Sequence, residues 1–265
     1  ARVCVLDDLF TGKIKNLPTH PRLRFIQGSV TNCKLVEKLV CASEFVFHLA
    51  ARNIIVSTKF PEKDFAVNIG GTLQVLRAAR EARKLQRIVY ASSASIYGNS
   101  SQFPIHENMP AITLSPYAVS KCAGENYCTA FNRTFGIPTV SLRYSNVYGP
   151  GQDSANPYCG VMSKFISGIE QNNAITIFGD GKQTRDFTYI DDVVEATLRA
   201  GVSSQAIGEV FNVSTGIETS IRSIAVIFKK MYTKPFAINF AAKRDIDSIR
   251  RRVLSSKRIQ ARLHW

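Results

Sequence analysis

The sequence predicts an α/β fold in which helices cover both faces of a parallel β-sheet. Short apolar segments alternate with longer helical ones, and residues 44–50 form an apolar run with almost no polar interruption. Hydroxyl side chains also gather where a later apolar segment ends. Because a strand that is covered on both faces needs no alternation of polar and apolar residues, such runs are typical of parallel sheets.

Composition indicates the class of protein. With 265 residues, of which 45% are hydrophobic, the chain can bury a large core as one domain or two closely joined ones. No apolar run reaches the roughly 18 residues that a membrane span needs, and the first residues lack the pattern of a signal peptide. We therefore expect a soluble protein with no membrane partner.

Cysteines stand at positions 4, 33, 41, 122, 128 and 159, and no two of them form a Cys-x-x-Cys pair. Most lie inside apolar stretches, so we interpret them as reduced core thiols rather than disulfides or zinc ligands. We expect no metal site and a cytoplasmic location.

The first half of the chain predicts strands and helices in alternation. Residues 1–8 indicate a buried strand that ends in acids, residues 24–27 a short strand, 31–42 a helix and 44–50 a third strand. A long helix is expected over residues 61–83 and a further strand over 87–92. That strand runs into Ser92-Ser93-Ala94-Ser95-Ile96-Tyr97-Gly98, which places hydroxyls where open α/β sheets bind ligands.

Residues 116–135 predict a helix with clear ends. Ser115 can cap it, Pro116 suits its first turn, and Gly136 followed by Pro138 ends it. Residues 139–143 then predict a return to the sheet, so the alternation indicates a doubly wound architecture.

After Pro150 the pattern changes. A polar loop to Pro157 is followed by a helix from about residue 161 to 171. Residues 174–178 and 186–190 flank Gly179-Asp180-Gly181, and the Asp-Gly step is typical of a tight turn. We therefore predict a β-hairpin or a short β excursion here.

Tyr117 and Lys121 stand four residues apart in the predicted helix, so both lie on one face. A free tyrosine has a pKa of about 10 and is a poor base near neutral pH. A cation one turn away favours the phenolate, which would then accept a proton from a substrate hydroxyl. The spacing alone is a weak signal, because most such pairs are solvated surface residues.

Together with the serine-rich strand end, this pair resembles the extended short-chain dehydrogenase/reductase superfamily, in its nucleotide-sugar epimerase/dehydratase branch. The similarity spans nearly all of the chain. The other matching segments are Phe47-His48-Leu49-Ala50-Ala51, Asn68-Ile69-Gly70-Gly71-Thr72, Leu142-Arg143-Tyr144-Ser145-Asn146-Val147-Tyr148-Gly149-Pro150 and Arg185-Asp186-Phe187-Thr188-Tyr189-Ile190-Asp191-Asp192.

The resemblance implies two domains. Residues 1–150 would form an NAD-binding Rossmann-type domain, to which the chain returns at about 184–214, and residues 151–265 would form mainly a smaller, interleaved substrate domain. In such folds a glycine-rich turn precedes, by about 20 residues, the acid that binds the adenosine ribose. Asp7 matches that acid, so we expect the first strand, the glycine turn and the first helix to precede Ala1.

The resemblance also implies NAD-dependent chemistry that begins with hydride removal from a sugar carbon. Tyr117 matches the base that takes the hydroxyl proton, and Ser93 matches the serine that hydrogen-bonds the reacting oxygen. Lys121 matches the lysine that holds the nicotinamide ribose and depresses the tyrosine pKa. Without the resemblance these residues would be a buried aromatic, a helix cap and a surface lysine.

Two further sets of residues follow from the resemblance. The expected cofactor-binding residues are Asp7, Asp8, Leu49, Ala50, Ala51, Asn68, Ser92, Tyr117, Lys121 and Tyr144. The expected substrate-binding residues are Ser93, Asn146, Val161, Thr176, Phe178, Arg185 and Arg251. Arg185 matches an arginine that grips the diphosphate with its planar charged fork. The run of three arginines at 250–252 leaves the register of Arg251 open.

Three positions depart from the family pattern. Ser29 stands where a carboxylate usually holds the adenine, Ser145 replaces a usual phenylalanine, and Gly151 replaces a frequent arginine. The first departure lowers the cofactor affinity that we expect.

Within the family, the residues after the first strand-end hydroxyls favour a UDP-hexose 4-epimerase acting through a 4-keto intermediate. Dehydratases and decarboxylases place an acid there, whereas this chain has Ala94 and Ser95. The substrates would be UDP-glucose and UDP-galactose or their N-acetyl forms. The alternatives are a 4,6-dehydratase or decarboxylase, or a catalytically silent relative that binds a nucleotide sugar or nucleic acid.

The family is often dimeric through the helix of the Tyr/Lys pair and its neighbour, so we expect a homodimer. The net charge of +14 would also suit nucleic-acid binding. Most basic residues are scattered, although residues 243–262 hold eight Lys/Arg against Asp245 and Asp247. We interpret that run as the basic tail of an enzyme that handles a diphosphate, and we expect no nucleic-acid partner.

Overall fold

The computed structural model describes residues 1–152, 160–244 and 249–265. It divides into two compact units, and the chain passes from one to the other several times. Unit 1 consists of Ala1–Ser92, Thr113–Leu142 and Arg199–Val210, and unit 2 of Ser93–Ile112, Arg143–Leu198 and Phe211–Trp265. Each unit has a hydrophobic core of its own.

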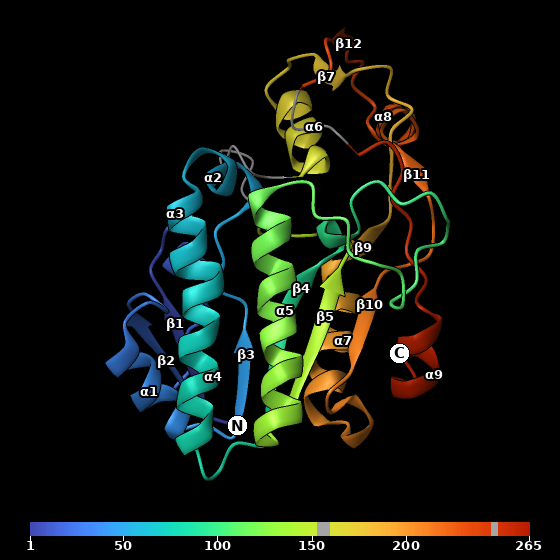
Figure 1. The fold of residues 1–265 in the computed structure, drawn as a ribbon. Helices are drawn as coiled ribbons and strands as arrows, with labels where there is room; N and C mark the ends of the chain where they lie inside the picture. Colours follow the sequence, from blue (N-terminus) through green and yellow to red (C-terminus); the bar gives the residue numbers. More distant parts are fainter. Residues whose placement is uncertain (153–159, 245–248) are drawn as a thin grey trace. The chain divides into compact units, whose positions relative to one another are not determined.

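Parallel strand pairs form the frame of unit 1. Strand β1 (Val3–Asp7) pairs in parallel with β2 (Leu23–Gln27). Strand β3 (Phe45–His48) pairs in parallel with β4 (Arg87–Ser93), in a sheet of order β10-β5-β4-β3. The remaining strands of that sheet are β5 (Thr139–Tyr144) and β10 (Val210–Val213). The predicted α/β fold with a parallel sheet is confirmed (Figure 1).

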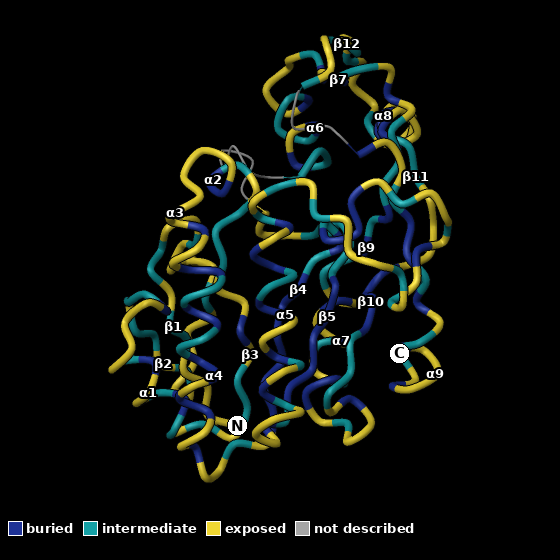
Figure 2. The backbone as a smooth tube through the Cα atoms, viewed as in Figure 1, coloured by how far each residue is buried: buried dark blue, intermediate teal, exposed yellow. Residues whose placement is uncertain are grey.

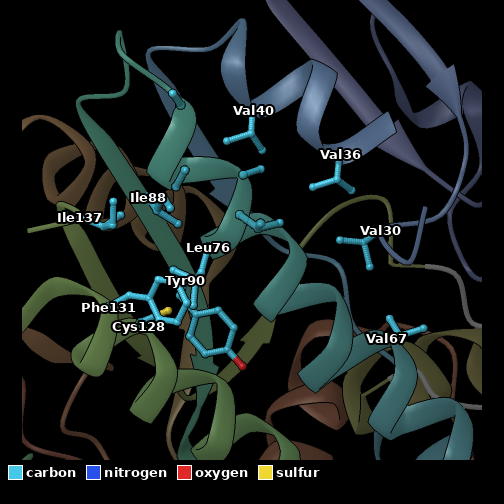
Figure 3. Close-up of a cluster of buried hydrophobic side chains, with 14 residues drawn as sticks. Val30, Val36, Val40, Val67, Leu76, Ile88, Tyr90, Cys128, Phe131 and Ile137 are labelled. Carbon is cyan, nitrogen blue, oxygen red and sulfur yellow. The ribbon is translucent and has the colours of Figure 1, made fainter. Parts of the chain in front are cut away.

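Helices cover both faces of β4, because successive side chains of a strand point to opposite faces. Tyr90 joins a buried cluster with Leu76 of helix α4 (Gly71–Glu81) and Phe131 of helix α5 (Pro116–Phe135), as Figure 3 shows. Val89, on the other face, lies near Gly201 of helix α7 (Ile190–Val202). Nearly all of β4 and β5 is therefore buried (Figure 2).

The ends of α5 follow the predicted capping chemistry. The Ser115 side chain accepts a hydrogen bond from the backbone N–H of Ala118 at 3.2 Å, and Pro116 occupies the first turn. Gly136 takes the left-handed conformation that ends the helix, with φ of 68°. Since α5 begins where predicted, Tyr117 and Lys121 lie in its first turns.

The single long helix predicted over residues 61–83 is wrong in detail. The segment consists of α3 (Pro61–Asp64), a π-helix over Phe65–Gly70, and α4. The i→i+5 bonding of a π-helix shifts which side chains face inward, and such turns are frequent at functional sites. A short helix α2 (Ile54–Lys59), capped by the Asn53 side chain, was not predicted. The spacing of apolar residues in the sequence does not distinguish a π-turn from an α-turn.

The remaining elements complete the two units. In unit 1, α1 spans Cys33–Cys41, and 3-10 turns span Ile14–Asn16 and Ser204–Ala206. In unit 2 the remaining helical elements are a 3-10 turn (Ala94–Tyr97), α6 (Val161–Glu170), α8 (Ile221–Met231) and α9 (Lys257–Leu263). Its short strands are β6 (Asn146–Tyr148), β7 (Ile175–Phe178), β8 (Thr184–Arg185), β9 (Phe187–Tyr189), β11 (Thr219–Ser220) and β12 (Ile238–Ala241).

Of the two alternatives predicted for residues 174–190, the hairpin is wrong, because the two short strands do not pair with each other. Strand β7 pairs in parallel with β12, and β9 pairs in parallel with β6. The turn itself is present, with positive φ at Gly179 and Gly181. The strands find longer-range partners because Ile175 and Ile177 pack into a core with residues of α6 and α8.

The interpretation of the cysteines as core thiols holds for Cys128, which is buried, but it is wrong for Cys4 and Cys33, which are exposed. The strand of Cys4 and the helix of Cys33 present these side chains outward. Cys41 and Cys122 are partly buried. All five described cysteines are free thiols, and Cys159 lies outside the described residues.

Within the described ranges, no helix is both long enough and apolar enough to cross a membrane.

The close approach of α5 to β4 gives a first prediction. A Cβ at Gly124 would lie 2.3 Å from the Tyr90 hydroxyl oxygen and 2.7 Å from its Cζ. We expect Gly124→Ala to lower the free energy of unfolding by about 1–2 kcal/mol, because overpacking outweighs the gain in helix propensity. In a Tyr90→Phe background the penalty should be smaller, since the hydroxyl is gone. Urea unfolding of the four proteins measures this, and an unchanged midpoint for Gly124→Ala would contradict the packing.

Candidate functional site

A pocket of about 510 Å³ lies within unit 1 and extends along β1 and β3 to the residues that follow them. Its lining includes Asp7 and Asp8 at the end of β1, and Leu49, Ala50 and Ala51 just after β3. Acids and small side chains thus meet at the carboxyl ends of parallel strands, where open α/β sheets bind ligands. Five residues that the sequence assigned to the cofactor lie together here.

The two acids of this pocket have different partners. One carboxylate oxygen of Asp7 accepts a hydrogen bond from the backbone N–H of Leu9 at 2.6 Å. Asp8 forms an ion pair with Arg52 at 2.6 Å, and the Arg52 guanidinium lies 4.1 Å from the centroid of the Phe10 ring. Burial alone would raise the pKa of Asp8, but the hydrogen bonds from Arg52 and from the backbone lower it below its usual value.

Asn68, which the sequence assigned to the cofactor, braces the segment after β3. Its side-chain oxygen accepts the Arg52 backbone N–H at 2.6 Å, and its side-chain nitrogen donates to the Arg52 carbonyl at 3.0 Å. The side-chain amide of Asn68 therefore hydrogen-bonds both backbone groups of Arg52, as a neighbouring strand would, and fixes the backbone that follows Ala51. Asn68 itself is buried, and Thr72 donates to its carbonyl oxygen at 2.6 Å.

Lys121 is only 3% exposed, which excludes a surface Tyr/Lys pair. Its ammonium donates a hydrogen bond to the carbonyl of Ala91 at 2.6 Å and lies 5.0 Å from the centroid of the Tyr90 ring. Burial lowers the pKa of Lys121 to about 8, although the negative charge of Asp64 opposes this change. Tyr117, one turn earlier on α5, is partly exposed.

The two serines that end β4 have separate roles. The buried Ser92 hydroxyl donates to the Glu125 carboxylate at 2.7 Å, within the interior of unit 1. The Ser93 oxygen accepts the backbone N–H of Ser95 at 3.2 Å and so caps the 3-10 turn that follows the strand. Ser92 does not line the pocket along β1 and β3.

Several predicted residues of unit 2 lie at element ends. The Tyr144 hydroxyl shares a 2.7 Å hydrogen bond with Thr197, and burial raises the pKa of Tyr144 to about 12. Asn146 begins β6, and its backbone N–H donates to the carbonyl of Asp186 at 3.0 Å. Val161 begins α6.

On β7, Thr176 is exposed, whereas its neighbours Ile175 and Ile177 point into the core of unit 2. The guanidinium of Arg244 lies 4.5 Å from the centroid of the Phe178 ring. Thr176 and Phe178 therefore lie on the face of β7 opposite to Ile175 and Ile177.

The structure brings Arg251, in a segment outside the strands, beside β8, which carries Arg185. Glu218 accepts two hydrogen bonds from Arg251, at 2.7 and 2.8 Å, and one from the Thr184 hydroxyl at 2.5 Å. The hydrogen bonds from Arg251 lower the pKa of Glu218 to about 2. Arg185 follows Thr184 on β8, which pairs with β11 beside Glu218. In the three-arginine run, Arg250 pairs instead with Asp180 at 2.7 Å.

Sequence reasoning missed the residues that support this site, above all Asp64, Ser57 and Ser120. Asp64 accepts hydrogen bonds from both serine hydroxyls and from the Asn68 amide. One signal was available, because Asp64, Asn68 and Thr72 are four residues apart and so share one helical face. Polar residues repeated at that spacing inside an apolar helix indicate a buried polar network.

Comparison with known proteins covers most of the chain. The sequence profile of the NAD dependent epimerase/dehydratase family matches residues 2–214. The UDP-glucose 4-epimerase of Mycolicibacterium smegmatis is 34% identical over 266 residues, which cover 98% of this chain and 84% of that protein. The human dTDP-D-glucose 4,6-dehydratase is 35% identical over 228 residues, which cover 83% of this chain and 63% of that protein.

Solved structures agree with this comparison. The UDP-glucuronic acid 4-epimerase of Bacillus cereus, solved in complex with UDP-glucuronic acid and NAD, superposes with a TM-score of 0.90 at 32% identity. The match covers 100% of this chain and 85% of that one.

The bracing role of Asn68 gives a second prediction. We expect Asn68→Ala to lower the free energy of unfolding by about 2 kcal/mol, because the buried backbone groups of Arg52 lose their partners. Hydrogen exchange at the Arg52 amide should accelerate by about tenfold or more as the segment after β3 loosens. The matched control is Asn53→Ala, which removes only the cap of α2 and should leave exchange at Arg52 unchanged. Equal exchange rates in both variants would contradict the brace.

Proposed function

The chain belongs to the NAD-dependent epimerase/dehydratase family, and we propose that it is an NAD-dependent epimerase that interconverts UDP-hexoses at carbon 4 through a 4-keto intermediate. The observation that carries this proposal is the buried ammonium of Lys121, one helical turn from Tyr117 at the start of α5. A buried cation beside a phenol is the arrangement that makes tyrosine an effective base near neutral pH.

The residues of unit 1 fit the dinucleotide. Acids at the end of β1 and small residues after β3 line one pocket, which suits ribose hydroxyls and a closely approaching backbone. Asp7 and Asp8 would hold the adenosine ribose, and Leu49 to Ala51 would lie along the cofactor. Lys121 would contact its nicotinamide end, and Ser92 would contribute through the strand end that it stabilises. Outside unit 1, Tyr144 is proposed as a further contact of the nicotinamide. Bound NAD supplies the hydride acceptor and donor for the sugar carbon.

Tyr117 would take the proton of the sugar 4-hydroxyl and later return it. The ammonium of Lys121 stabilises the phenolate, and the Ser93 hydroxyl would hydrogen-bond the reacting oxygen. Epimerisation further requires that the ketone turn over before it is reduced, so the hexose pocket must hold the sugar less tightly than its diphosphate.

The choice of epimerisation over dehydration rests on the residues after Ser93. Ala94 is buried in the 3-10 turn and offers no proton donor, and a serine at 95 is too weakly acidic to replace a carboxylic acid. The alternative remains dehydration, because the human dehydratase is as similar in sequence as the mycobacterial epimerase. Product analysis separates them, since a dehydratase yields a 4-keto-6-deoxy sugar.

We assign the nucleotide sugar to residues of unit 2. Arg185 and Arg251 would grip the diphosphate, because guanidinium groups bind phosphate oxygens in pairs. For Arg251 this requires exchange of its present partner, Glu218. Asn146 and Val161 would line the diphosphate and sugar, and Thr176 and Phe178 would receive the base. With these roles, residues 1–150 serve mainly the cofactor and 151–265 mainly the substrate.

We place the enzyme in the cytoplasm, because its described cysteines are free thiols and nucleotide-sugar interconversion uses soluble substrates. No nucleic-acid partner is proposed. A titration with duplex DNA tests that point, since nucleic-acid binding would weaken steeply as salt rises.

The third prediction tests the catalytic base. Tyr117→Phe should lower kcat with UDP-glucose or UDP-N-acetylglucosamine by at least about 100-fold, because the proton acceptor is lost. NAD and UDP binding should change little. The control is Tyr232→Phe, a phenol among the aromatic rings of unit 2, which should retain full activity. Turnover by Tyr117→Phe at the wild-type rate would refute the assignment, and a 4-keto-6-deoxy product would move the enzyme to the dehydratases.

We also propose a homodimer through α5 and its neighbour α4, which lie side by side (Figure 1). Val119 on α5 is 50% exposed, and Phe65, at the start of the π-helix that leads into α4, is 63% exposed. Large apolar side chains exposed on adjoining helices are typical of an interface.

The fourth prediction follows from this interface. Sedimentation velocity should give a dimer for the wild type, and Val119→Arg should shift it to a monomer, since a buried unpaired charge opposes association. Val226→Arg, at a similarly exposed valine on α8, should leave the dimer intact. A wild-type monomer at about 50 μM, well above the dissociation constant expected for a stable dimer, would contradict the proposal.

A further inference from the structure

Asp64 is a buried acid for which the proposed reaction has so far had no use. It ends α3, directly before the π-helix, and is 3% exposed. Aspartate is almost never buried to this degree unless it is paired, because removing a carboxylate from water costs several kcal/mol. The partners of Asp64 therefore indicate what the acid does.

A single carboxylate oxygen, Oδ1, receives hydrogen bonds from three side chains. The Asn68 amide nitrogen donates at 2.6 Å, the Ser120 hydroxyl donates at 3.0 Å, and Ser57 donates as well. The orientation of the Asn68 amide is not ambiguous, because its oxygen accepts the Arg52 N–H. Asp64 Oδ1 is therefore an acceptor, as an ionised carboxylate requires.

Each donor connects Asp64 to a different part of unit 1. Asn68 holds the backbone of Arg52 after β3. Ser57 belongs to α2, and its one hydroxyl proton is shared between Asp64 and the carbonyl of Asn53. Ser120 shares its proton between Asp64 and the Tyr117 carbonyl, each at 3.0 Å, and directly precedes Lys121 on α5. One carboxylate thus ties the turn of α5 that carries the Tyr/Lys pair to the segment after β3.

The charges of Asp64 and Lys121 also interact. The charge of Asp64 raises the pKa of Lys121, against a larger lowering by burial. Burial raises the pKa of Asp64, and the hydrogen bonds from Ser57 and Ser120 and the charge of Lys121 oppose that change. Because both groups are buried, solvent screens their attraction only weakly.

The other titratable groups near Lys121 lie on β3, β4 and α5. They are His48, Tyr90, Tyr117, Glu125 and Cys128. Burial lowers the pKa of His48 to about 3, raises the pKa of Tyr90 well above its usual value and raises the pKa of Cys128 to about 12. These three are neutral near pH 7. The Glu125 carboxylate accepts the hydrogen bond from Ser92, and Asp64 is the carboxylate whose charge raises the pKa of Lys121.

We propose that Asp64 is a positioning residue, which keeps Lys121 a cation and holds the Tyr/Lys turn of α5 against the segment that follows β3. The catalytic role of Asp64 rests on the proposed function, but its effect on the charge of Lys121 does not depend on that function. The acid does not touch the reacting atoms; it acts through Lys121, Ser120 and Asn68.

The fifth prediction measures the electrostatic part directly. The ¹³Cε resonance of Lys121, assigned by its absence in Lys121→Met, is followed from about pH 6 to about pH 11, across the range in which lysines titrate in proteins. Asp64→Asn keeps an acceptor oxygen and removes the charge, so the pKa of Lys121 should fall by about one unit. An unchanged Lys121 titration in Asp64→Asn would overturn the proposal.

Two controls separate charge from architecture. Glu62→Gln removes an exposed acid from the same helix and should leave the Lys121 titration unchanged, because water screens its charge. Ser57→Ala removes one donor to Asp64 and should lower the urea midpoint of unfolding without lowering the pKa of Lys121. If Glu62→Gln lowered that pKa as far as Asp64→Asn does, the buried carboxylate would have no special role.

Kinetics extend the test to the proposed reaction. In Asp64→Asn the alkaline limb of the kcat/KM profile should move down by about one pH unit, so the loss of activity should be about tenfold greater above the limb than below it. A loss of equal size at every pH would indicate a merely structural role and overturn the proposal. If the wild type epimerises no UDP-sugar, the proposed function fails, while the Lys121 titration still decides the role of Asp64.

Discussion

The burial of the Lys121 ammonium is the constraint on which the candidate site depends. An ammonium removed from water needs hydrogen-bond acceptors and negative charge close by, or it loses its proton. Unit 1 supplies the carbonyl of Ala91 at the end of β4 and the carboxylate of Asp64 at the end of α3. The first turns of α5 are thereby fixed to the strand end and to the helices beside it, where a cation can stabilise a phenolate.

A second consequence concerns the cofactor side of unit 1. The same network that surrounds Lys121 reaches Arg52 through Asn68, and Arg52 pairs with Asp8 at the end of β1. The turn of α5 that carries the proposed base and Asp8, one of the two acids proposed for the ribose, are therefore joined by consecutive hydrogen bonds and one ion pair. Such a shared network would hold the proton-transfer group and the dinucleotide pocket in a fixed position relative to each other.

Sequence patterns were informative where a local rule decides the structure. Ser115, Pro116 and Gly136 specify the ends of α5 by capping chemistry, so the position of the Tyr/Lys pair followed from neighbouring residues. The apolar run before His48 similarly predicted a parallel strand, although β3 is less covered than expected, since Phe47 is exposed. The hairpin at Gly179 to Gly181 failed, because a turn signal predicts a reversal of the chain but not the partner of each strand.

The sequence by itself determined the α/β fold, the helix that carries Tyr117 and Lys121, and the ordered motifs of an epimerase/dehydratase, because each depends on residues close together in the chain. Only the tertiary structure decided that Lys121 is buried, that Asp64 accepts hydrogen bonds from Ser57, Asn68 and Ser120, and that Arg251 lies beside β8. Burial and hydrogen bonding of this kind join segments separated by tens of residues, and no local pattern specifies which distant groups meet.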